Sequence, residues 1–227
     1  MNYGTKKRIE DLFYDALVSV AARVQDSDLS NLSANEFSGS LARDLLGFES
    51  TDEYARFLIQ QRMERSLSTT LGTVLSATAN EIAVGRTRES TRQLLVLQRG
   101  RSRFAVLVKT GPKSMNPAQA ARFRVKLRNL PGGPPDRTVL GICYGEPGEV
   151  STTLLRYLGD DVQVRAGKEF WTFLTDEAST YAEILAAARA AGKRFREIQG
   201  PGILRNLQTS TVSRIGRQIE RKWGGQH

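Results

Sequence analysis

The sequence predicts an α/β fold in which a mixed sheet is flanked by helices. Three observations support this fold class. Between residues 9 and 82, apolar residues recur three and four positions apart, as they do on one face of a helix. Short apolar runs then follow one another between residues 93 and 165 and are typical of strands. After residue 180 the helical spacing returns.

The N-terminal region is predicted to be helical. Residues 5–25 place one apolar face on a helix, formed by Ile9, Leu12, Phe13, Ala16, Leu17, Val20 and Ala21. The polar stretch at residues 25–40 is predicted to be a loop. A second helical region begins near Asp52 and continues to about residue 82, where Val74, Thr78 and Ile82 keep the helical spacing.

In the middle of the chain, the predicted order of elements is strand, strand, helix, strand, helix, strand. "QLLVL" (93–97) and "FAVLV" (104–108) flank a turn at Gly100 and predict a β-hairpin. "FAVLV" does not alternate, so we expect this strand to be buried on both faces. Asn116 as a cap and Pro117 as the first residue predict a helix up to "PGGPPD". "TVLGICY" (138–144) and "DVQVR" (161–165) are the later strands.

The C-terminal part is again predicted to be helical. One helix face carries Tyr181, Ile184, Leu185, Ala188, Phe195 and Ile198, and a last segment carries Leu204, Leu207, Val212, Ile215, Ile219 and Trp223. That basic segment could be a core helix, a dimer arm or a DNA-contacting arm. We expect a single domain, with a mainly helical region at 1–85, the sheet-containing core at 86–200 and the helical segment at 201–227.

Charge and composition narrow the class of partner. Lysine and arginine total 33 against 24 aspartate and glutamate, a formal net charge of +9 with a pI near 10.0, which favours a polyanionic partner. The chain has no apolar run of the roughly 18 to 20 residues that span a bilayer. Residues 1–17 lack the apolar segment of a signal peptide, so a cytoplasmic protein is expected.

Few residues are available for catalysis. Cys143 is the only cysteine and His227 the only histidine, which excludes a disulfide framework and a zinc site made of cysteine and histidine. The same count argues against a Ser-His-Asp hydrolase. Any chemistry must therefore depend on carboxylates and lysines.

The stretch "VLVKTGPKSMNP" (106–117) holds the candidate site. Lys109 leaves the strand at its end, where partial burial and a positive charge suit an approaching anion. Gly111, Pro112 and Lys113 then lead to a helix start, with Ser114 and Asn116 as further polar groups, and such a start favours a phosphate. The alternative for Lys109 is a lysine that buries only its aliphatic stem at a strand end. The alternative for the following residues is an ordinary connection between a strand and a helix. The glycine-rich Walker pattern is absent.

These residues give the chain a family resemblance. With Lys109, Thr110, Gly111, Pro112, Lys113 and Asn116, it resembles type II restriction endonucleases of the PD-(D/E)XK superfamily. "CYG" (143–145) and the Phe170, Trp171 and Phe173 element are similar to strings in that family, and the resemblance covers roughly residues 60–200. It implies a restriction-endonuclease-like core in which the strand lysine acts beside two or three carboxylates that hold Mg²⁺.

The carboxylates that the resemblance implies are missing from their expected positions. Leu107 stands two residues before the lysine, Gln93 and Leu94 stand where the family has an aspartate, and Ser76 stands where a helix glutamate is expected. Two explanations are open. In the first, the carboxylates have migrated to Glu64 and Glu81, as catalytic and metal-binding groups, and to Glu89, as a metal ligand. Alternatively, the chain has lost metal binding, and these glutamates are ordinary ion-pair partners.

Basic and polar side chains around the hairpin and Lys109 are the candidate DNA contacts. The expected set is Thr110, Lys113, Ser114, Asn116, Arg99, Arg101 and Arg103, and Arg122, Arg124, Lys126 and Arg128 follow on the next helix. A solvated arginine face is the alternative for the basic residues. Phe170 and Trp171 are expected in the core.

The resemblance implies a type II restriction endonuclease that cleaves double-stranded DNA at specific sites with Mg²⁺. A homodimer is expected, because two copies of one site match the two strands of a duplex. The alternative is a non-catalytic DNA-binding protein, or a degenerate partner subunit, on the same fold. An RNA-binding protein fits the charge but not the resemblance.

Overall fold

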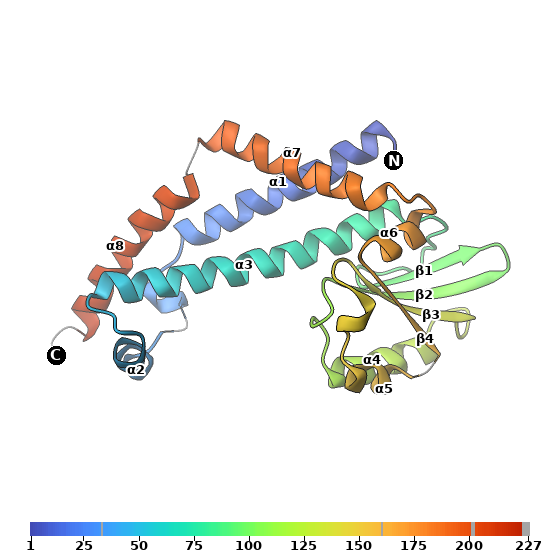
Figure 1. Ribbon diagram of the computed structural model, residues 1–227, viewed down its shortest axis with the longest axis horizontal. Coiled ribbons are helices and arrows are strands. Elements are labelled where there is room, and N and C mark those ends of the chain that lie inside the picture. Colours follow the sequence, from blue (N-terminus) through green and yellow to red (C-terminus); the bar gives the residue numbers. More distant parts are fainter. Residues whose placement is uncertain (33, 160, 201–202, 224–227) are drawn as a thin grey trace. The chain divides into compact units, whose positions relative to one another are not determined.

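The computed structural model describes residues 1–32, 34–159, 161–200 and 203–223, which form two compact units (Figure 1). The first unit contains residues 1–12 and 71–189, and the second contains residues 13–70 and 190–227. No helix in the described part of the chain is long and apolar enough to cross a membrane.

The first unit is built on a four-stranded mixed sheet in the order β1-β2-β3-β4. Its strands are β1 (Leu94–Arg99), β2 (Ser102–Lys109), β3 (Arg137–Ile142) and β4 (Val162–Ala166). β1 and β2 form the predicted antiparallel hairpin, while β2, β3 and β4 are parallel. The prediction of an α/β protein with a mixed sheet is therefore confirmed.

Two crossover helices cover one face of the sheet, α4 (Pro117–Arg128) and α5 (Thr152–Leu158) (Figure 1). The predicted cap of α4 is confirmed, because the Asn116 side chain accepts a hydrogen bond from the Gln119 backbone N–H at 2.9 Å. Phe123 of α4 and Leu154 of α5 pack in one apolar cluster with the strand residues of this face. A short 3-10 turn, η2 (Pro147–Glu149), precedes α5.

The opposite face of the sheet is covered by α6 (Gly167–Thr175) (Figure 1). Its Phe170 ring lies directly over Gly141 of β3, and a β carbon at residue 141 would overlap that ring. Phe170 and Trp171 are buried, which confirms that they belong to the core. Phe170, Trp171 and Leu174 have helical spacing. The sequence analysis assigned no element to this segment, because an apolar run as short as "FWTFL" is also compatible with a buried strand.

The next helix, α7 (Thr180–Gln199), was predicted with a partly wrong apolar face. Ile184 and Phe195 are buried as expected, but Leu185 and Ile198 are exposed. Small alanine side chains at 187 and 191 complete the buried face instead. Alanine is common on both the buried and the exposed faces of helices, so its spacing is a weak guide to the face that packs.

The second unit is helical. Its elements are the larger part of α1 (Tyr3–Gln25), η1 (Leu29–Asn31), α2 (Glu36–Leu46), most of α3 (Thr51–Ile82), the end of α7, and α8 (Ile203–Trp223). Ile215 of α8 packs in a buried cluster with Leu58 and Ile59 of α3. The last segment could have been a core helix, a dimer arm or a DNA-contacting arm, and this packing is that of a core helix. Leu204 and Leu207 were predicted to lie on the apolar face of this helix, but their side chains are outside the described part of the structure.

The expectation of a loop over residues 25–40 was wrong at its C-terminal end, where α2 begins. The Asn35 side chain accepts a hydrogen bond from the Ser38 backbone N–H at 2.9 Å. This capping interaction starts a helix within a segment whose serine and asparagine residues also favour turns.

Candidate nucleic-acid interface at the end of strand β2

Lys109 is the last residue of β2, at the carboxyl edge of the three parallel strands. Its side chain leaves the strand on the same face as Leu107, because alternate residues of a strand share a face. That face is the one covered by α4 and α5. Lys109 is half-buried, and its burial, followed by the charge of Lys126 on α4, lowers the pKa of its ammonium.

The loops that follow β2 and β3 are held against each other. The Cys143 backbone N–H donates to the Lys109 carbonyl at 2.8 Å, and the Tyr144 N–H donates to the Thr110 carbonyl at 3.2 Å. Gly111 lies so close to the Tyr144 ring that an added β carbon would be 2.7 Å from it. The tyrosine ring therefore supports the turn that carries Lys109.

Two further elements support the same turn. Gly72 of α3 lies against Thr110, and a β carbon at residue 72 would be 2.7 Å from the threonine hydroxyl oxygen. The Trp171 indole N–H of α6 donates to the Cys143 carbonyl at 2.8 Å. The "KTGP", "CYG" and "FW" strings, distant in sequence, thus lie together in one region of the first unit.

Of the positions where the resemblance implies carboxylates, residues 94 and 107 are apolar and packed, whereas Gln93 is polar and exposed. Leu94 of β1 is the direct cross-strand partner of Leu107 of β2, and both belong to the same buried cluster. Ser76 is nearly buried on α3, where its carbonyl accepts a hydrogen bond from the Asn80 side chain. Mg²⁺ requires oxygen ligands and retains several waters. The leucine pair supplies no ligand, so the residues at these positions do not fit Mg²⁺.

The structure gives the three candidate glutamates different surroundings. Glu81 accepts a hydrogen bond from the Arg8 side chain at 2.6 Å, and Glu89 is paired with Arg103. Glu64 is exposed on the part of α3 that belongs to the second unit. Within the described residues, no group of three or more histidine, cysteine, aspartate or glutamate side chains is arranged to hold a metal ion. The structure thus gives Glu81 and Glu89 arginine partners and shows no metal-binding cluster that includes them.

The candidate DNA-contacting arginines differ in their surroundings. Arg101 is exposed at the hairpin tip. Arg99 donates to the Leu174 carbonyl at 3.0 Å, pairs with Asp176, and lies 4.8 Å from the Phe173 ring centroid. Arg103 donates to the carbonyls of Gly133 and Pro131 and to Glu89. Arg99 and Arg103 therefore have intramolecular roles, which leaves Arg101 as the arginine of this set that is free to reach a ligand.

The polar residues after Lys109 are similarly divided. Lys113 is exposed. The Ser114 hydroxyl donates to the Gly111 carbonyl at 2.6 Å, and Asn116 caps α4. Thr110 is partly buried against Gly72. These three polar side chains shape the turn, while Lys109 and Lys113 supply its charge.

Two residues of this region were not selected as site residues by the sequence analysis. Tyr144 is 45% exposed although its ring supports Gly111, so one part of it remains open to a ligand. Gly72 was passed over as an ordinary helix residue. A glycine in the middle of a long helix is destabilising, and this is the signal that could have marked a close approach of another segment.

Replacing Lys109 with methionine is expected to raise the free energy of unfolding near neutral pH. The pKa of Lys109 is lowered in the folded protein, so folding costs free energy while the ammonium is charged. Between that lowered pKa and the ordinary value of 10.5, the unfolded chain binds more protons, so wild-type stability rises with pH there. The advantage of the variant should shrink across that range. Urea unfolding at several pH values tests this, and a variant that is less stable at neutral pH would contradict it.

Comparisons with known proteins identify no family for this chain. No protein-family model matches it, and no curated protein matches it. Its function must therefore be argued from the geometry around Lys109.

Proposed function

We propose that this protein binds double-stranded DNA through the edge of the sheet at Lys109, on a restriction-endonuclease-like core that lacks the Mg²⁺ ligands of a nuclease. The observation that carries the proposal is the combination of a half-buried lysine on the supported turn with the leucine pair of Leu94 and Leu107 beside it. Such a site can bind a phosphate but cannot hold a metal ion at those positions.

The charge around this edge supports binding to the DNA backbone. α4 starts directly after the turn and carries exposed basic side chains, Arg122, Arg124, Lys126 and Arg128. Within the described part of the chain none of these four has a salt bridge, so their charge is available to an external anion. Contacts of lysine and arginine with phosphates provide affinity that does not depend on sequence and that decreases with salt.

A burial argument distinguishes Lys109 from the other basic residues. An exposed lysine costs little to keep charged, whereas a half-buried lysine with a lowered pKa reduces stability at neutral pH. Residues that lower stability in this way are typical of functional sites. We therefore assign Lys109 a direct contact with a DNA phosphate.

Site-specific cleavage of DNA with Mg²⁺ by a homodimer is the second candidate function. The position of Lys109 at the end of β2, where the resemblance implies the strand lysine of a nuclease, favours it. This candidate requires carboxylates from elsewhere, such as Glu64, Glu81 or Glu89. We rank it second because Glu81 and Glu89 already pair with arginines.

The test compares Lys109→Met with Lys193→Met, which removes the charge of an exposed lysine on α7. We expect Lys109→Met to bind duplex DNA about tenfold more weakly and to reduce the slope of log K against log salt by about 0.9, the value for one lost phosphate contact. Lys193→Met should bind like the wild type. Fluorescence anisotropy at several salt concentrations measures both quantities, and equal affinities of the two variants would contradict the assignment.

The same preparation distinguishes the candidate functions. Incubation with varied plasmids, with Mg²⁺ or with a chelator, is expected to leave the DNA intact. Discrete fragments that require Mg²⁺ would establish the nuclease instead. Tighter binding to structured RNA than to duplex DNA would overturn both candidates.

A further inference from the structure

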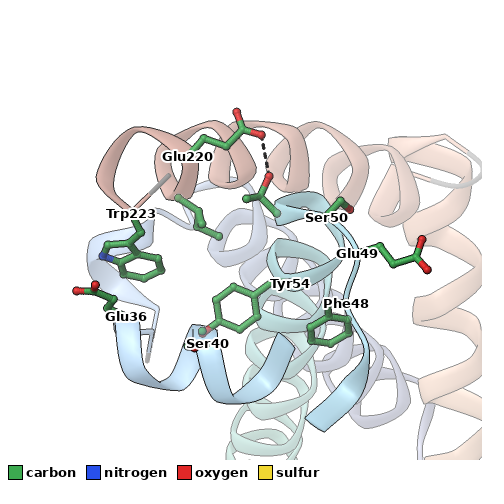
Figure 2. A pocket seen from close by; sticks show the side chains of 11 residues that line it. Glu36, Ser40, Phe48, Glu49, Ser50, Tyr54, Glu220 and Trp223 are labelled. Carbon is green, nitrogen blue, oxygen red and sulfur yellow. Dashed lines mark hydrogen bonds between the residues drawn. The ribbon is translucent and has the colours of Figure 1, made fainter. Parts of the chain in front are cut away.

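The second unit contains a cavity of about 370 Å³ that lies between α2, the start of α3 and the end of α8. Three aromatic residues line it, namely Phe48, Tyr54 and Trp223. Figure 2 shows the Tyr54 and Trp223 rings around one open space, with the Glu36 carboxylate beside the indole. A cavity of this volume is within the usual range for small-molecule sites.

The charged side chains that line the cavity, within the described part of the chain, are all acidic. Among the described side chains, Glu36, Glu49 and Glu220 line it and no lysine or arginine does. Glu220 accepts a hydrogen bond from the Thr51 hydroxyl at 2.8 Å. Across the described residues, the carboxylates of Glu36 and Glu49 have neither a salt bridge nor a hydrogen bond. In a chain with a net charge of +9, this local surplus of negative charge points to a cationic ligand.

The aromatic rings favour the same kind of ligand. Aromatic faces attract cations, and tryptophan does so most strongly. The Lys222 ammonium already lies 5.9 Å from the Trp223 ring centroid, although Lys222 does not line the cavity. Trp223, the last residue of α8 that the structure describes, lines the cavity. α3 begins there with its positive end, which the carboxylates of Asp52 and Glu53 in its first turn offset.

We propose that this cavity binds a small alkylammonium compound, in which a positively charged nitrogen carries apolar substituents. The rings would contact the substituents, and the Glu36 carboxylate would lie near the charge. A bare metal ion does not use the aromatic surface, and a neutral apolar molecule does not use the carboxylates. Recognition of such a cation depends only on the second unit and does not require that the protein binds DNA.

The test uses choline and 3,3-dimethylbutan-1-ol, which have the same shape and differ in the central atom and its charge. We expect saturable binding of choline by isothermal titration calorimetry, and binding of the neutral alcohol about tenfold weaker. The indole N–H signal of Trp223 should shift with choline in ¹⁵N NMR spectra, while that of the buried Trp171 stays in place. Trp223→Phe assigns the two signals.

Matched variants test the role of each group. Glu36→Gln removes one charge from the lining and should weaken choline binding severalfold, and Trp223→Leu should weaken it about tenfold. Asp44→Asn removes a charge from an exposed residue of the same helix, α2, and should bind choline like the wild type. Circular dichroism checks that each variant is folded.

Two results would overturn this inference. One is equal affinity for choline and for the neutral alcohol, or no saturable binding of choline. The other is competition by Mg²⁺ or K⁺ at concentrations equal to that of choline, which would show that the carboxylates act alone.

Discussion

Replacement of Trp171 by alanine is expected to lower the free energy of unfolding by about 3–5 kcal/mol. This is the largest loss of stability that we expect for any variant of this protein. Trp171 is 1% exposed, and its indole N–H donates to the Cys143 carbonyl at 2.8 Å. The variant loses the contacts of a large ring and leaves a buried carbonyl without that donor. Urea unfolding followed by circular dichroism measures the change.

Trp171→Phe separates the two contributions. Phenylalanine keeps a ring in the core but cannot donate to Cys143, so we expect an intermediate loss of about 1–3 kcal/mol. A loss below about 1 kcal/mol for Trp171→Ala would mean that α6 does not support the sheet as the structure shows, since core tryptophan deletions cost more than this. Because Cys143 precedes Tyr144, both variants should also weaken DNA binding under conditions where the protein is still folded.

Gly111→Val is expected to have the largest effect on DNA binding, with a loss of at least about tenfold, together with about 1–3 kcal/mol of stability. A β carbon at residue 111 would lie 2.7 Å from the Tyr144 ring, and valine adds two methyl groups there. The turn must then move away from the tyrosine and carry Lys109 with it. Anisotropy titrations and urea unfolding measure the two effects.

Two further variants make this prediction specific. Gly148→Val is the matched control, because a β carbon at that exposed glycine meets no atom within 4 Å. It should bind DNA like the wild type. Combining Gly111→Val with Tyr144→Ala should recover part of the lost stability, since the second change removes the ring that the valine would strike. Additive losses in the double variant would contradict the contact.

The two functional variants of the turn should differ in their effects on stability. Lys109→Met weakens DNA binding and raises stability at neutral pH, because it removes a half-buried charge. Gly111→Val weakens DNA binding and lowers stability, because its side chain overlaps the Tyr144 ring and displaces the turn. This difference in sign separates a residue that contacts the ligand from one that positions the turn.

The local structure of the middle of this protein can be predicted from residues that are neighbours in the chain. The hairpin, the two later strands and the Asn116 cap of α4 depend on turn residues, apolar runs and a capping side chain that are close together in the chain. Interactions over a few residues are sufficient for such elements. The helices α2 and α6 were missed although both segments carry apolar residues at helical spacing, because both are short. The Asn35 cap starts α2, and the burial of Phe170 and Trp171 holds α6 in place.

The set of side chains that form the candidate site depends on contacts between residues far apart in the chain. The sequence analysis selected Lys109 from its place after an apolar run, but Leu94 becomes the neighbour of Leu107 only through the pairing of two strands. In the same way, Arg103 is occupied because the chain returns to it at Gly133 and at Glu89. Every arginine carries the same charge in the sequence. Charge alone therefore does not distinguish an arginine that is bound to other residues of the protein from one that can reach a ligand. That distinction depends on burial and long-range contacts, and these exist only in the folded protein.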